Sequence, residues 1–131
     1  MGGLRLTDES PMTEIRLTAD FQRQARRLEK RYRQLRSDLQ TVLAQIQMGE
    51  LIGDRLQGIS AEVFKVRVRN SDANRGKSGG YRVIYWLKLP ELAVLLDIYS
   101  KSDKDDVEIS TIQNIISEFE NQNDDEMTSW Q

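Results

Sequence analysis

Apolar residues recur along this chain with two different periods. Residues 63–69 alternate strictly, so their apolar side chains share one face of a strand while Lys65, Arg67 and Arg69 share the other. Further runs with strand-like alternation or with β-branched and aromatic residues cover residues 14–18, 81–87 and 92–99.

Three other segments carry the helical period of three and four residues. The first follows Asp20, a residue suited to cap a helix. A second begins at a capping box in residues 37–40 and stops at Gly49, so the two form a helical hairpin. The last helix starts near residues 103–106, whose carboxylates suit a helix N-terminus, and its apolar stripe ends at Phe119.

The order β-α-α-β-β-β-α predicts an α+β fold: a small antiparallel-rich sheet with an N-terminal helical hairpin and a C-terminal helix. The length of 131 residues suits one domain. Polar composition predicts a flexible N-terminal extension over residues 1–12 and an acidic disordered tail over residues 120–131. The domain itself is therefore expected at residues 13–119.

The composition excludes several kinds of chemistry. The chain has no cysteine and no histidine, which removes thiolate and histidine nucleophile systems, most zinc sites and the usual general base. We therefore expect no metal and no cofactor. No run approaches the roughly 18 apolar residues of a membrane span, and no signal peptide is recognisable. These features predict a cytoplasmic protein without a membrane partner.

Charge is distributed unevenly along the chain. The formal net charge of -2 hides a net of +5 over residues 20–36, +6 over residues 55–88 and -9 over residues 91–131. A basic body with an acidic end indicates a surface that binds a polyanion.

The basic strand residues have candidate neighbours on the sheet. Arg82 lies on the next strand, and Lys101 and Lys104 follow the third strand beside Tyr99. A solvated outer face of a sheet accounts for a single basic strand. Cations from three strands around an aromatic ring instead suit a phosphate backbone with a stacked base.

Gly76-Lys77-Ser78 is similar to the end of a phosphate-binding P-loop. Ser71 occupies the position of that motif's first glycine, and strand-forming residues follow where a helix should begin. Lys77 is therefore predicted to contact a nucleic-acid backbone from a glycine-bearing hairpin loop.

Three stretches together resemble the RelE/ParE toxin superfamily, and more narrowly its RelE/HigB-like branch from bacterial type II toxin–antitoxin pairs. They are Val-Phe-Lys-Val-Arg-Val at 63–68, Gly-Lys-Ser-Gly-Gly-Tyr-Arg-Val-Ile-Tyr at 76–85 and Ile-Tyr-Ser-Lys-Ser-Asp-Lys-Asp-Asp-Val at 98–107. The resemblance covers roughly residues 13–119. It implies a RelE-like fold and a ribosome-dependent, metal-independent endoribonuclease (mRNA interferase) that inhibits translation. Its implied partners are the ribosome, mRNA and a cognate antitoxin protein.

The resemblance also implies site residues. By position, the catalytic set is Lys65, Arg67, Arg82 and Lys101, and the substrate-binding set is Lys77, Tyr99 and Lys104. Crowding by two arginines disfavours the charged form of Lys65, which makes it the candidate general base.

Alternatives stay open at this point. The chain has Ser102 where some family members carry a second arginine, and Glu108 where they carry a tyrosine. A ParE-like inhibitor of DNA gyrase shares the implied fold, and an inactive relic that only binds its antitoxin accounts for both departures. A plain nucleic-acid-binding module accounts for the charge alone.

Overall fold

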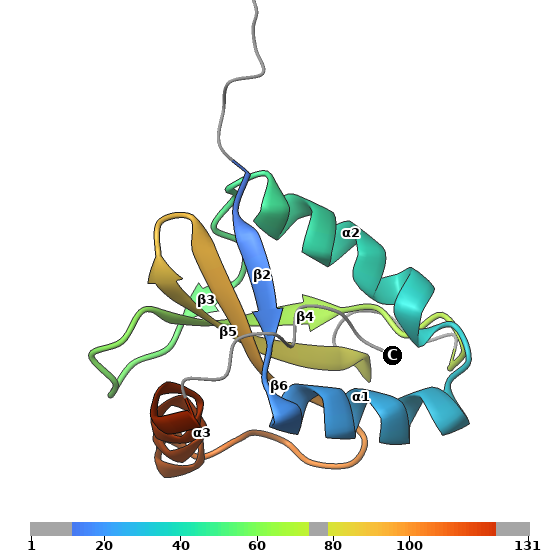
Figure 1. The fold of residues 1–131 in the computed structure, drawn as a ribbon. Coiled ribbons are helices and arrows are strands. Elements are labelled where there is room, and N and C mark those ends of the chain that lie inside the picture. The colour runs from blue at the N-terminus through green and yellow to red at the C-terminus, as the bar shows by residue number, and fades with distance from the viewer. Residues whose placement is uncertain (1–11, 74–78, 123–131) are drawn as a thin grey trace, which may run out of the picture.

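A computed structural model describes residues 12–73 and 79–122, which form three layers (Figure 1). The helices α1 and α2 cover one face of a central sheet, and α3 covers part of the other face. The elements follow the chain in the order β2 (Glu14–Leu17), α1 (Ala19–Arg31), α2 (Leu35–Gln47), β3 (Asp54–Arg55), β4 (Val63–Val68), β5 (Tyr81–Leu89), β6 (Leu92–Ser100) and α3 (Ile109–Gln122).

The sheet is mixed and has five strands in the order β2-β6-β5-β4-β3. The pairs β3–β4, β4–β5 and β5–β6 are antiparallel, and the pair β2–β6 is parallel. The predicted α+β class is therefore confirmed as a small fold with three helices and a mixed sheet. The two-residue strand β3 was not predicted.

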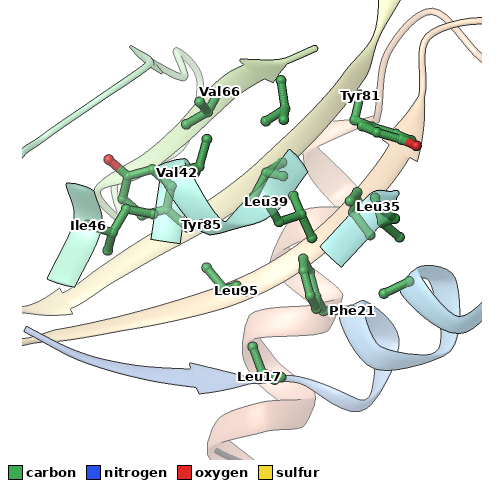
Figure 2. Close-up of a cluster of buried hydrophobic side chains, with 14 of the residues drawn as sticks. Leu17, Phe21, Leu35, Leu39, Val42, Ile46, Val66, Tyr81, Tyr85 and Leu95 are labelled. Atoms are coloured by element: carbon green, nitrogen blue, oxygen red, sulfur yellow. The ribbon is translucent and has the colours of Figure 1, made fainter. Parts of the chain in front are cut away.

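The larger core lies between the helical hairpin and the sheet. Figure 2 shows the α2 side chains Leu35, Leu39, Val42 and Ile46 directed at the strands. Phe21 of α1 joins them, and all five are buried. This packing explains the helical period in these segments, since one stripe of each helix is removed from water.

A second core forms under α3. Ile112 and Ile115 are buried against the opposite face of the sheet, and Phe119 meets Trp86 edge to face with ring centroids 6.4 Å apart. Because α3 covers only the end of the sheet near Trp86, polar side chains occupy the other end of this face.

All three helix starts differ from the sequence prediction, and α3 begins at Ile109, beyond the predicted start near residues 103–106. The cap of α1 is Thr18, not Asp20: its Oγ1 accepts a hydrogen bond from the Phe21 N–H at 3.0 Å and donates to carbonyls of β6. α2 begins at Leu35, before the predicted capping box, and has no side-chain bond from its own N-cap residue. A long-range contact takes that place, because Asp72 accepts a hydrogen bond from the Gln34 N–H at 2.6 Å.

The ends of the chain are described only in part. Residues 1–11 of the predicted extension and 123–131 of the predicted tail lie outside the described residues, and α3 continues to Gln122. Within residues 12–73 and 79–122, no helix has the length and apolar character needed to cross a membrane.

Candidate functional site

The sheet register brings the predicted site residues together. On the part of the α3 face that α3 itself leaves uncovered, Arg67 lies opposite Arg82, and Arg82 lies opposite Tyr99. One step along the strands, Lys65 lies opposite Ile84, in line with Asp97 of β6. Alternation along each strand therefore places the basic residues of β4 and β5 in two adjacent cross-strand rows, to which β6 adds Tyr99 and Asp97.

The turn after β6 adds two more cations. The Lys101 N–H donates to the Gly80 carbonyl at 2.8 Å, which continues the pairing of β5 and β6 by one residue. The backbone N–H of Lys104 donates to the Ser100 carbonyl at 3.2 Å, and the Lys104 ammonium lies 5.2 Å from the centroid of the Tyr99 ring. We call Lys65, Arg67, Arg82, Tyr99, Lys101 and Lys104 the basic cluster.

Exposure within the basic cluster differs from the prediction. Arg82 and Tyr99 each expose only 5% of their surface, whereas Arg67 and Lys104 are exposed. One Arg82 N–H donates to the Tyr81 carbonyl at 3.1 Å. Lys104 covers the Tyr99 ring, so this ring is not an open stacking platform. The solvent-facing charges come from Arg67 and Lys104, with Lys65 and Lys101 partly exposed.

Sequence reasoning missed Asp106, which lies just before α3 at the centre of the cluster. Its Oδ1 accepts hydrogen bonds from the Lys65 ammonium at 3.2 Å, the Tyr99 hydroxyl at 3.4 Å and the Val107 N–H at 2.8 Å. The hydrogen bond from the Val107 N–H is the main cause that holds the pKa of the Asp106 carboxyl below its ordinary value; burial opposes it, and the Lys65 ammonium adds to the lowering. The acidic run at residues 103–106 was its only sequence signal, and that run was assigned to a helix start.

This contact also bears on the predicted role of Lys65. The Lys65 nitrogen, which the predicted general base would use, lies 3.2 Å from the Asp106 carboxylate and is engaged in an ion pair. The role of Lys65 as a general base stays a prediction.

Burial shifts two further groups beside the basic cluster. Asp97 is 5% exposed and accepts a hydrogen bond from the Ile98 N–H at 2.9 Å; burial raises the pKa of its carboxyl. Burial likewise raises the pKa of the Tyr99 hydroxyl to about 12, helped by the negative charge of Asp106.

Two hollows border the basic cluster on opposite edges. A groove of about 920 Å³ runs between α2 and β4, where Lys65, Arg67 and Arg69 line one wall. A smaller hollow of about 190 Å³ lies between α1 and the end of β6, lined by Arg27, Lys104 and Tyr99, among others. Cations thus line both hollows, and the buried Arg82 lies on the strand between them.

The remaining predicted residue, Lys77, lies outside the described residues. Within the described ranges, no three acidic side chains are grouped so as to hold a metal ion.

Comparison with known proteins gives little likeness. No family model matches the chain, and no curated protein matches it. A solved structure that it resembles is the crystal structure of TrmO from Pseudomonas aeruginosa, with a TM-score of 0.45 and 18% sequence identity. That match covers 72% of this chain and 37% of the TrmO chain, so this chain spans well under half the length of that protein.

These findings correct the family prediction. The predicted membership of the RelE/ParE superfamily is not upheld: no family model and no curated protein matches the chain, and the structural likeness found is to TrmO. The predicted ribosome-dependent endoribonuclease is not upheld either, nor are the alternatives of a gyrase inhibitor and a toxin relic, because all of them rested on that resemblance. The cognate antitoxin stays a prediction that nothing here tests. The likeness to TrmO is too low to transfer any activity to this chain.

Proposed function

We propose that this chain binds single-stranded nucleic acid, RNA in the first instance, through the phosphate backbone and without chemistry of its own. The observation that carries the proposal is the in-register row of Arg67, Arg82 and Tyr99, flanked by Lys65 and Lys104. Lysine and arginine contacts to phosphate supply most of the affinity of nonspecific nucleic-acid binding.

The spacing of the exposed cations supports an extended ligand. Lys65, Arg67 and Arg69 occupy every second position along β4 and the residue that follows it. A strand rises about 7 Å over two residues, which is therefore the spacing of successive charges. All three line the groove beside α2. A flexible backbone with regularly repeated charges matches such a row better than a compact anion does.

The buried arginine has a part in this proposal. Arg82 is buried between Arg67 and Tyr99 in this row, and its positive charge adds to the potential of the nearby surface. The exposed residues Arg67 and Lys104 are therefore assigned the direct phosphate contacts.

Fluorescence anisotropy with a labelled 12-nucleotide RNA tests the proposal, with DNA of the same sequence as a second arm. We expect a Kd of about 10⁻⁶–10⁻⁴ M near physiological salt for RNA. The two assigned phosphate contacts give a slope of log K against log salt of about -1.4. Equal binding of DNA limits recognition to the shared phosphate backbone.

A matched pair of variants tests the location. Arg67→Gln should weaken RNA binding several-fold and make the salt slope shallower by about 0.7. Lys88→Gln removes the same charge from the exposed far end of β5, and should leave binding nearly unchanged. Absence of salt-dependent binding at about 10⁻³ M protein overturns the proposed function. An equal loss in both variants overturns the assigned site.

A further inference from the structure

The contacts of the Asp106 carboxylate point to a subsite within the basic cluster. Its Oδ1 accepts hydrogen bonds from an ammonium, a phenolic hydroxyl and a backbone N–H at once. Proteins contact phosphate oxygens with these same kinds of donor. Three donors suited to a phosphate oxygen therefore converge on one point, which the Asp106 Oδ1 occupies.

The carboxylate is not locked in this position by burial. The Asp106 side chain is 65% exposed, and it belongs to the segment between β6 and α3 rather than to either element. Exposed ion pairs contribute little net stability because water competes for both partners. An incoming anion can therefore exchange with Asp106 at low cost.

We propose that Lys65 and Tyr99 form a phosphate subsite that the chain's own Asp106 fills when no ligand is bound, and that a phosphate oxygen of bound nucleic acid replaces the carboxylate. This inference rests on the proposed function. Asp106 weakens the binding of every ligand by competing for Lys65. Asp106 also selects for ligands that have an anionic oxygen. When Asp106 moves away, the Lys65 ammonium needs a new anionic partner, and a neutral group cannot replace the carboxylate.

The neighbouring Asp105 provides a matched control. It carries the same charge one residue away, but its side chain is 97% exposed, and its carboxylate lies 3.9 Å from the Lys101 ammonium. Asp106→Asn keeps an acceptor oxygen for the Val107 N–H and removes only the charge. Removing either charge has the same long-range effect on a polyanion, so a difference between Asp106→Asn and Asp105→Asn reports the subsite.

RNA anisotropy titrations of the parent, Asp106→Asn and Asp105→Asn test the competition. We expect Asp106→Asn to tighten RNA binding about fivefold beyond Asp105→Asn, the factor given by one unit-charge repulsion at about 4 Å in water. Equal affinities of the two variants, or weaker binding by Asp106→Asn, overturn the subsite while leaving the proposed function intact. Failure of the parent and of both variants to bind RNA overturns the proposed function itself.

A double-mutant cycle identifies the group for which Asp106 competes. In the parent, the ammonium of Lys65 exchanges one anion for another when RNA binds, so Lys65→Ala should cost little affinity. In the Asp106→Asn background, RNA supplies the first anion, and Lys65→Ala should cost several-fold more. Equal costs in both backgrounds show that Asp106 does not compete for Lys65, and overturn the subsite.

Discussion

Arg67 and Arg82 lie directly opposite each other on the antiparallel strands β4 and β5, so one cross-strand position holds two positive charges. Like charges in this arrangement destabilise a sheet. Arg82 is buried and Arg67 is exposed, so only one of the two facing charges is in contact with solvent. A pair of facing like charges that lowers stability is typical of a site where binding is favoured at the expense of stability.

Replacing Arg67 with threonine should separate stability from binding. Threonine suits a strand and removes one of the facing charges, so we expect the free energy of unfolding to rise by about 0.2–1 kcal/mol. RNA affinity should fall in the same variant. Urea denaturation and anisotropy measure the two effects. Lys88→Thr, at the far end of β5, should gain no comparable stability, and a stability loss in Arg67→Thr contradicts the repulsion.

Gly80 should tolerate no side chain. A Cβ at this position lies 2.1 Å from the Val68 carbonyl oxygen and 3.0 Å from the Asn70 nitrogen, both backbone atoms that cannot rotate away. Gly80→Ala should therefore destabilise the fold by about 1–3 kcal/mol, the usual range for overpacking. It should also displace the adjoining Lys101, whose N–H bonds to the Gly80 carbonyl.

Gly49 supplies the comparison for Gly80. Its φ is +88°, and its Cβ position is open. Gly49→Ala should cost about 1–2 kcal/mol from backbone strain alone and leave RNA binding unchanged. Thermal or urea unfolding of both variants gives the energies, and unchanged RNA binding by Gly80→Ala contradicts the link to Lys101.

Asp97 should make the protein less stable as the pH rises out of the acid range. Its carboxyl has a raised pKa in the folded state, so folding retains a proton that the unfolded chain releases near pH 3.9. The free energy of unfolding is unaffected below that pH and falls as the pH rises toward the folded pKa. Asp97→Asn removes this fall and should be more stable than the parent at pH 7, but not at about pH 3. Urea unfolding at both pH values measures the difference in the free energy of unfolding between Asp97→Asn and the parent. Asp105→Asn is the exposed control. An equal gain in stability of Asp97→Asn at both pH values contradicts a titration effect.

The periodic segments of this fold were predictable because local pattern and burial agree there. Residues 63–69 were predicted as a strand and form β4 over Val63–Val68, with the basic face as expected. The start of α2 was not predictable, because Asp72 satisfies the Gln34 N–H from a distant loop that no local motif reveals. β3 was missed because two residues carry no period.

The candidate site shows the same division. The convergence of Lys65, Arg67, Arg82 and Tyr99 follows from alternation in adjacent strands, and the structure places them so. The position of Asp106 depends on how the segment before α3 approaches the sheet, and the burial of Arg82 depends on tertiary packing; the sequence pattern encodes neither. The family resemblance, which short motifs carried, was not upheld by the comparisons, since a basic strand and a glycine-bearing loop are compatible with more than one kind of protein.

The tyrosines report on the burial beside the basic cluster. Burial raises the pKa of Tyr85 and of Tyr99 to about 12, and raises that of Tyr81 further still. A phenol whose pKa is higher in the folded state loses its proton more readily when unfolded, so stability should fall as the pH rises above about 10. At about pH 11 these three buried tyrosines should leave the 295 nm absorbance of the native protein short of that of the urea-unfolded chain by the equivalent of about 2.5 tyrosinates. Tyr99→Phe should reduce this deficit by about one tyrosine, and Tyr85→Phe by the same amount as a core reference. A deficit that Tyr85→Phe reduces and Tyr99→Phe does not shows that the Tyr99 hydroxyl is open to solvent, and contradicts the covering of its ring by Lys104 and the hydrogen bond to Asp106.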